Sequence, residues 1–96
     1  MKLDSKIAIV TGGASGLGEA SCLALSNAGC SIVVADLNEE AGQKLVESLK
    51  TPSIFVKVDV SNEESIKNLF EKAVQKFGAV HIVVNSAGIL IHILAT

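Results

Sequence analysis

Residues 11–18, with the sequence Thr-Gly-Gly-Ala-Ser-Gly-Leu-Gly, have the residue types and spacing of a loop that binds phosphate groups. The segment follows the apolar run 7–10 and leads into a stretch with helical spacing. Glycines in such a loop let the backbone turn sharply and approach a ligand without clashes from Cβ atoms. The N-terminus of the next helix offers N–H groups without intrahelical partners and the positive end of a dipole. The sequence therefore predicts an anion-binding site here.

Two other phosphate or nucleophile motifs do not fit this segment. A Walker A loop would run from Gly13 to Gly18, but Glu19 stands where that motif needs its phosphate-binding lysine. A nucleophile elbow would place Ser15 at its centre, yet Leu17 takes the position of the last glycine. The chain is therefore not expected to bind ATP or GTP in that way, or to use Ser15 as a nucleophile.

An acidic residue beyond the loop favours a dinucleotide as the ligand. The fingerprint G-x-G-x-x-G fits only as far as Gly18, because Ser21 replaces its last glycine, and a tight turn without ligand is the alternative for the loop alone. Asp36 ends the next apolar run, where a carboxylate can accept hydrogen bonds from ribose hydroxyls; a solvated turn residue is the alternative. No arginine near Asp36 could offset its charge beside a 2′-phosphate, so we expect NAD(H) rather than NADP(H).

The chain alternates short apolar runs with segments of helical period, which is typical of βαβ units and a parallel sheet. Right-handed crossovers predict an α/β fold, the N-terminal half of a Rossmann-like doubly wound parallel sheet with strand order 3-2-1-4. We expect an NAD-binding half-domain over residues 1–88 and an apolar tail over 89–96. The expected strands are 6–10, 31–35, 54–58 and 80–84.

Three helices are expected between these strands. Gly29 and Gly78 should end the first and third, and Asn38 should begin the second. A capping box of the S-x-x-E type, from Ser61 to Glu64, should begin the third. The predicted inward-facing residues are Leu17, Ala20, Ala24 and Ala28, then Ala41, Leu45 and Leu49, then Ile66, Leu69, Phe70, Ala73, Val74 and Phe77.

Every polar motif of the chain follows the end of a predicted strand. The glycine loop follows the first strand, Asp36 the second, Asp59 and Val60 the third, and residues 85–88 the fourth. Ligands of open parallel sheets bind beyond the carboxyl ends of the strands, where the strand order reverses. We therefore expect these four segments to converge on one crevice.

Composition excludes several other classes of protein. The 96 residues suit one globular domain, and a net charge of −2 with only three aromatic residues, all Phe, argues against nucleic acid as a partner. The apolar stretch 79–95 contains polar residues and has no basic flank, so a buried strand explains it better than a membrane span.

The cysteines and histidines do not indicate metal or redox chemistry. Cys22 and Cys30 match no zinc or C-x-x-C spacing and are interpreted as reduced packing residues, while His81 and His92 have no partner at metal-ligand spacing. No cleaved targeting signal is visible at the N-terminus. We expect no metal site and an intracellular protein, cytoplasmic or mitochondrial.

Together these motifs resemble the short-chain dehydrogenase/reductase family. Residues 11–18 look like its cofactor loop, Asp59 and Val60 like the pair beside the adenine, and residues 85–88 like its N-N-A-G element with serine second. The resemblance extends through Ile89. The loop is also similar to that of type-2 3-hydroxyacyl-CoA dehydrogenases and related hydroxysteroid dehydrogenases.

This resemblance implies hydride transfer between a nicotinamide and a secondary alcohol or ketone. Asp59 and Asn85 have an alternative role, which is to tie loops together through backbone hydrogen bonds. The implied contacts are Gly12, Ser15, Gly16, Leu17 and Gly18 with the pyrophosphate, Asp36 and Leu37 with the adenosine ribose, Asp59 and Val60 with the adenine, and Asn85, Ser86, Ala87 and Gly88 near the nicotinamide ribose.

The chain departs from the family in one decisive respect, since it contains no tyrosine. The family transfers its proton through a tyrosine, assisted by a lysine and a serine, all beyond the fourth strand. We therefore assign no catalytic residue and expect this chain alone to be inactive, the alcohol or ketone substrate belonging to a full-length relative.

The sequence leaves two further roles open. The predicted fourth strand would be an open sheet edge, able to pair with a second copy or another chain. The alternative function is a non-catalytic NAD-binding or protein-interaction module; a sheet that binds S-adenosylmethionine fits the loop less well.

Overall fold

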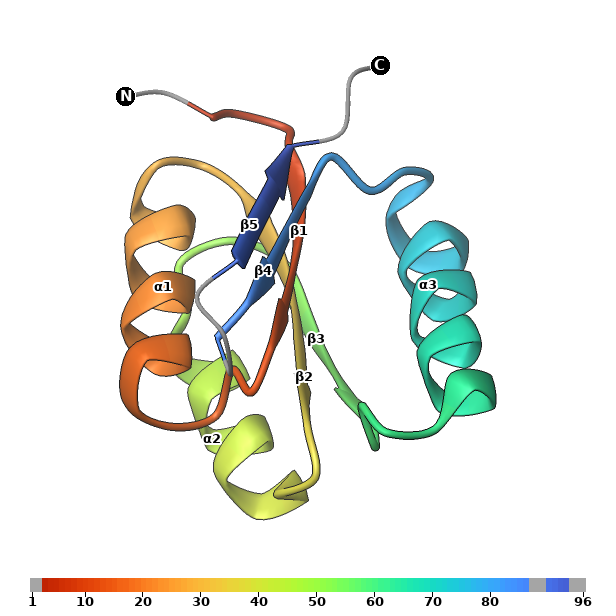
Figure 1. Cartoon of the computed structure of the whole chain (residues 1–96). Helices are drawn as coiled ribbons and strands as arrows, with labels where there is room; N and C mark the ends of the chain where they lie inside the picture. The colour runs from red at the N-terminus through yellow and green to blue at the C-terminus, as the bar shows by residue number, and fades with distance from the viewer. Residues whose placement is uncertain (1–2, 87–89, 94–96) are drawn as a thin grey trace.

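The computed structural model describes residues 3–86 and 90–93 and shows a single sheet with helices on both faces (Figure 1). Each strand is a short run dominated by apolar residues, and the N-caps Ser15, Asn38 and Asn62 stand directly before the three helices. In chain order the elements are β1 (Ile7–Thr11), α1 (Gly16–Asn27), β2 (Ser31–Asp36), α2 (Glu39–Ser48), β3 (Ser53–Lys57), α3 (Glu63–Phe77), β4 (Ile82–Asn85) and β5 (Leu90–Ile93).

The strand order is β3-β2-β1-β4-β5, and the first four strands are parallel. The sequence-based prediction of a Rossmann-like sheet with order 3-2-1-4 is therefore confirmed. β1 is central, with Ile9 opposite Val33 of β2 and Val83 of β4. The reversal of strand order falls between β1 and β4, which is the position where such sheets bind ligands.

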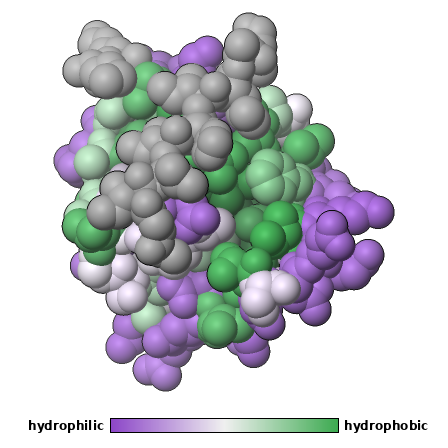
Figure 2. Space-filling model, in the orientation of Figure 1, coloured by the Kyte–Doolittle hydropathy of each residue, from purple (hydrophilic) through white to green (hydrophobic). Residues whose placement is uncertain are grey.

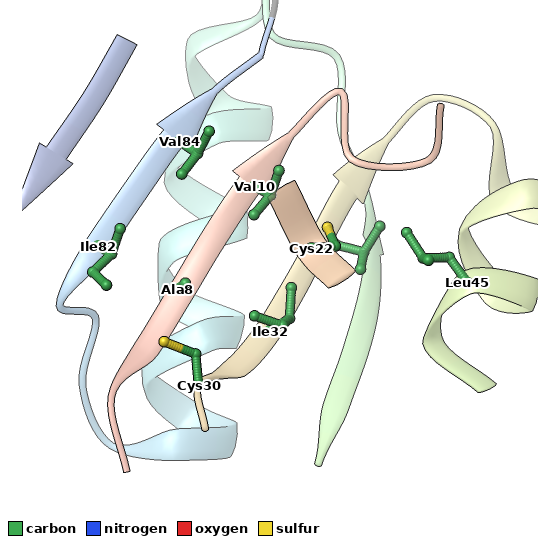
Figure 3. Close-up of a cluster of buried hydrophobic side chains, with 9 residues drawn as sticks. Ala8, Val10, Cys22, Cys30, Ile32, Leu45, Ile82 and Val84 are labelled. Atoms are coloured by element: carbon green, nitrogen blue, oxygen red, sulfur yellow. The ribbon is translucent and has the colours of Figure 1, made fainter. Parts of the chain in front are cut away.

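Side chains of β1 and β2 alternate between two buried layers. Ala8, Val10 and Ile32 lie on the face that α1 and α2 cover, in one buried cluster with Cys22 of α1 and Leu45 of α2 (Figure 3). The other face packs against α3 through Ile9, Val33, Ala35, Val56, Val58, Leu69 and Ala73. Burial on both faces explains why the strands read as continuous apolar runs in the sequence.

The predicted inward face of α1 is wrong. Leu17 is 62% exposed, and Ala20 and Ala24 are also exposed, whereas Gly18, Cys22 and Ser26 are buried. The helix is apolar on nearly all sides, so periodicity alone does not fix its rotation. What fixes the rotation is that Gly18 packs against the glycine loop, which turns the residues four and eight positions later inward.

Two details of α3 also differ from the prediction. Its N-cap is Asn62, whose Oδ1 accepts a hydrogen bond from Ser65 N at 3.1 Å, so the capping box from Ser61 is wrong. Ser61 instead donates its hydroxyl hydrogen to Asp59. Val74 is 48% exposed and lies outside the buried stripe.

Other helix ends follow the sequence signals. Asn38 accepts a hydrogen bond from Ala41 N at 3.0 Å and begins α2 as predicted. Gly29 and Gly78 follow the ends of α1 and α3 with φ values of 106° and 85°. The prediction of these three boundary residues is confirmed. Each residue type suits a helix end, where backbone groups lack intrahelical partners.

The edge of β4 is not open, contrary to the prediction. β5 pairs with it in antiparallel fashion, with Ile82 opposite Ile93 and Asn85 opposite Leu90. The sequence predicts no element within residues 89–96, because a run of four residues, three apolar and one histidine, gives no clear period. Pairing satisfies backbone groups of β4 that would otherwise lie along an unprotected edge.

Hydrophobic residues gather at the centre of the view in Figure 2, and hydrophilic residues cover the outer side of α3.

Within residues 3–86 and 90–93, we find no helix with the length and apolar character needed to cross a membrane.

Candidate functional site

The glycine loop lies between β1 and α1, at the carboxyl end of the central strand. Gly16 has a φ of 55°, and a Cβ atom placed there would meet no atom of the described residues within 4 Å. A Cβ at Gly18 would instead overlap the carbonyl oxygen of Gly12. The first turn of α1 is therefore seated directly on the loop, with open space beside Gly16.

Ser15 is the N-cap of α1, and the first N–H groups after it lie next to this open space in the chain. Its carbonyl oxygen accepts hydrogen bonds from Gly18 N at 3.1 Å and from Glu19 N at 3.3 Å. The N–H groups of Gly16 and Leu17 precede the first intrahelical bond, so helix geometry gives them no intrahelical acceptor. Two backbone donors and the positive end of the helix dipole can therefore meet an anion at this point.

Asp36 connects the end of β2 to the glycine loop. Its Oδ2 accepts a hydrogen bond from Ala14 N at 3.0 Å, and its Oδ1 accepts one from Asn38 N at 3.0 Å. An ionised carboxylate offers about four lone-pair positions, so two positions are left for further donors such as ribose hydroxyls. Asp36 can thus shape the loop and still receive a ligand.

Asp59 lies in the loop that joins β3 to α3. Its Oδ1 accepts hydrogen bonds from the Ser61 hydroxyl at 2.6 Å and from Ser61 N at 3.0 Å. The Ser61 hydroxyl bond, followed by the backbone bond, lowers the pKa of the Asp59 carboxyl below its ordinary value. The loop-tying role that the sequence left open for Asp59 is therefore present, and Oδ2 has no such bond to Ser61.

The end of β4 is also bound to the glycine loop. Thr11 Oγ1 donates to Asn85 Oδ1 at 3.3 Å, and Ser86 Oγ donates to the Thr11 carbonyl oxygen at 2.6 Å. Ala87 and Gly88, the other two predicted residues of this segment, lie outside the described residues. The site residues of β1 and β4 are thus brought together as predicted.

Three apolar side chains are exposed in the loops and helix start at this edge. Leu17 and Leu37 are each 62% exposed, and Val60 is 51% exposed. They follow β1, β2 and β3 respectively. Such side chains can cover the apolar faces of a sugar and a base, the groups that the family resemblance implies for Leu37 and Val60.

His81 has a structural role that sequence analysis did not find. Its ring Nδ1 accepts a hydrogen bond from Ile7 N at 3.0 Å, and the backbone N–H of His81 donates to the Ile7 carbonyl oxygen at 2.9 Å. The ring proton must therefore be on Nε2. His81 lies at the amino ends of β1 and β4, away from the glycine loop, and its place just before a strand was the only sequence signal.

A depression of about 290 Å³ lies between α1 and α2, at one side of the glycine loop. Ala14 and Glu19 line it near the loop, and Leu23, Ala41, Lys44, Leu45 and Ser48 line the remainder. Among residues 3–86 and 90–93, no group of three or more His, Cys, Asp or Glu could hold a metal ion.

The family model for short chain dehydrogenases matches residues 6–95. The chain belongs to the short-chain dehydrogenase/reductase family. It is 37% identical over 89 residues to secoisolariciresinol dehydrogenase of Forsythia intermedia, covering 92% of this chain and 32% of that protein. It is 40% identical over 92 residues to cyclohexanol dehydrogenase of Acinetobacter sp. strain SE19, covering 93% of this chain and 37% of that protein.

Solved structures of the family show the same arrangement. A hydroxysteroid dehydrogenase from Escherichia coli matches with a TM-score of 0.84 and 32% identity, over 88% of this chain and 36% of that one. The gox2181 structure matches with a TM-score of 0.83 and 39% identity, over 88% of this chain and 34% of that one. The chain spans about a third of the length of these short-chain dehydrogenase/reductases. Members of the family are oxidoreductases that generally bind NAD(P).

Proposed function

We propose that this chain is the NAD(H)-binding part of a short-chain dehydrogenase/reductase that acts on a secondary alcohol or ketone. The observation that carries the proposal is the loop between β1 and α1, where Gly16 has open space beside it and the first N–H groups of α1 have no intrahelical acceptor. Asp36 lies at the same edge with acceptor positions left. A pyrophosphate and a ribose fit these two sets of groups.

The proposed contacts are those that the family resemblance implies. Gly12, Ser15, Gly16, Leu17 and Gly18 hold the pyrophosphate, Asp36 and Leu37 the adenosine ribose, and Asp59 and Val60 the adenine. Asn85, Ser86, Ala87 and Gly88 are proposed to contact the nicotinamide ribose. When bound, the nicotinamide supplies or accepts the hydride, and this chain's residues hold and orient it.

We assign NAD(H) rather than NADP(H) as the cofactor because of charge. A 2′-phosphate would lie against the negative carboxylate of Asp36, and the chain contains no arginine to offset that repulsion. An uncharged ribose, by contrast, can donate two hydroxyl hydrogens to Asp36. The two cofactors should therefore differ clearly in affinity.

Substrate chemistry needs a group that moves the proton of the alcohol. The chain has no tyrosine, so we propose that it positions the cofactor without catalysing the reaction alone. The glycine loop is similar to that of 3-hydroxyacyl-CoA and hydroxysteroid dehydrogenases. This similarity favours a 3-hydroxyacyl-CoA or a hydroxysteroid as the substrate of the whole enzyme. The second candidate function, also favoured by the absence of tyrosine, is a non-catalytic NAD-binding or protein-interaction module.

Fluorescence titration of the chain with NADH and NADPH tests the cofactor assignment. We expect NADH to bind more tightly, and Asp36→Ala to weaken NADH by roughly tenfold or more, because hydrogen bonds to a charged group are lost. Glu47→Ala is the matched control, since it removes the same charge from an exposed position on α2. Equal affinity for NADPH, or an equal effect of both variants, would contradict the assignment.

An assay with simple secondary alcohols and a hydroxyacyl-CoA tests the catalytic part of the proposal. We expect binding of NADH without turnover. Turnover by the chain alone would show that a group other than tyrosine moves the proton, and would exclude the non-catalytic module.

A further inference from the structure

Ser86 is hydrogen-bonded to the glycine loop. A side chain whose role is to contact the cofactor would not need these hydrogen bonds. Its Oγ lies 2.6 Å from the Thr11 carbonyl oxygen and 3.2 Å from the Gly12 carbonyl oxygen, and its N–H donates to Thr11 O at 3.3 Å. The hydroxyl also fills the space beside Gly12, where an added Cβ would overlap it. Residues 74 and 75 positions apart are thus joined at the end of β4.

The peptide between Gly12 and Gly13 is held from both sides. The Ser86 hydroxyl contacts the Gly12 carbonyl oxygen from the side of β4. The N–H of the same peptide belongs to Gly13 and donates to the Ala35 carbonyl oxygen of β2 at 3.3 Å. The C=O and N–H of one trans peptide point in opposite directions, so these two contacts fix the plane of the peptide. The next N–H, on Ala14, is fixed by Asp36.

Fixing these peptides sets the shape of the loop before any ligand arrives. A loop that is already ordered loses less conformational entropy on binding, and the ligand gains affinity accordingly. The gain concerns the pyrophosphate, because that is the group the glycine loop faces in the proposed function.

We infer that Ser86 is a positioning residue, which holds the glycine loop in its binding shape from β4, and that its hydroxyl acts on the pyrophosphate site through the carbonyl oxygens of Thr11 and Gly12. This inference rests on the proposed function for the identity of the ligand. It differs from the role that the family resemblance implies, a place near the nicotinamide ribose.

Titrating wild-type chain and Ser86→Ala with ADP and with NAD separates the two roles. ADP shares the adenosine and pyrophosphate of NAD but lacks the nicotinamide riboside. A positioning role predicts that Ser86→Ala weakens ADP and NAD by the same factor, roughly threefold to tenfold for one lost hydrogen bond. Ser48→Ala is the matched control, because Ser48 bonds only within α2 through its hydroxyl to Leu45 O.

Amide hydrogen exchange in the ligand-free chain gives an independent readout. Ser86→Ala should speed exchange at Gly13 and Ala14, while the core amide of Ile9 stays protected and so reports that the variant is folded. The inference would be overturned if Ser86→Ala weakened the binding of NAD but not of ADP. It would also be overturned if the variant changed neither the affinity for the two ligands nor the amide exchange. If the wild-type chain bound neither ADP nor NAD, the proposed function would fail, and the exchange at Gly13 would still decide whether Ser86 holds the loop.

Discussion

Polar side chains at the carboxyl edge of the sheet form hydrogen bonds to backbone groups of neighbouring segments. Asp36 accepts from Ala14 N, Ser86 donates to Thr11 O, and Asp59 accepts from Ser61 N. A motif read from sequence identifies such residues by type and position, and all the described ones lie where the pattern put them. It could not show that they also shape the loops, because that depends on side-chain rotamers and on strand register.

Cys22 has the most strongly shifted pKa described for the chain, and it lies under the glycine loop. Burial, with a smaller contribution from the charge of Glu19, raises the pKa of its thiol from 9.0 to about 12. The folded state therefore favours the neutral thiol, and this contribution to stability is complete below pH 9 and is lost as pH rises toward 12.

We expect the free energy of unfolding of the wild-type chain to fall above pH 9, with Cys22 contributing about 1 kcal/mol per pH unit. Urea unfolding at pH 8, 9.5 and 10.5 measures this. The chain has no tyrosine to add to the effect. Cys22→Ala should be less stable at pH 8 but show a shallower decline; an identical decline would contradict the assignment to Cys22.

At the scale of elements, the positions of four strands and the boundary residues Gly29, Asn38 and Gly78 could be predicted, but the cap of α3 and the rotation of α1 could not. The strands are buried on both faces and read as apolar runs whichever way they turn. α1, by contrast, is turned by the contact between Gly18 and Gly12, a tertiary contact that periodicity does not reveal. β5 could not be predicted either, since four residues, of which three are apolar, specify no element by themselves.

The N-cap of α3 gives a direct test at this scale. Asn62→Ala removes the acceptor for Ser65 N and should lower the free energy of unfolding by about 1 kcal/mol. Ser61→Ala should cost less, because Ser61 bonds to the exposed Asp59 rather than to the helix. Urea unfolding compares the two; a larger loss for Ser61→Ala would indicate the S-x-x-E capping box instead.

At the scale of the whole molecule, β5 covers the edge of a strand with buried residues. Ile82 and Val84 of β4 are only 6% and 5% exposed, and β5 pairs with the whole length of β4. The sequence predicts an unprotected edge at β4, because residues 89–96 show only the pattern of an apolar tail. The family match over residues 6–95 extends through this strand.

Removal of residues 90–96 should therefore uncover the β4 edge and increase self-association. Sedimentation velocity over a range of concentrations measures this, and removal of residues 94–96 alone, which keeps β5, is the control. If both shortened chains behaved like the original, β5 would not protect the edge.

The central claim is that loops after four parallel strands form one NAD(H) site. Amide chemical shifts of the ¹⁵N-labelled chain, followed during titration with NADH, test it most directly. The account predicts that the largest shifts fall in residues 12–18, 36–37, 59–60 and 85–88, with little change near His81 or Thr51 at the opposite edge. Shifts centred on the α1–α2 depression around Lys44 and Ser48, or no shifts at all, would contradict it.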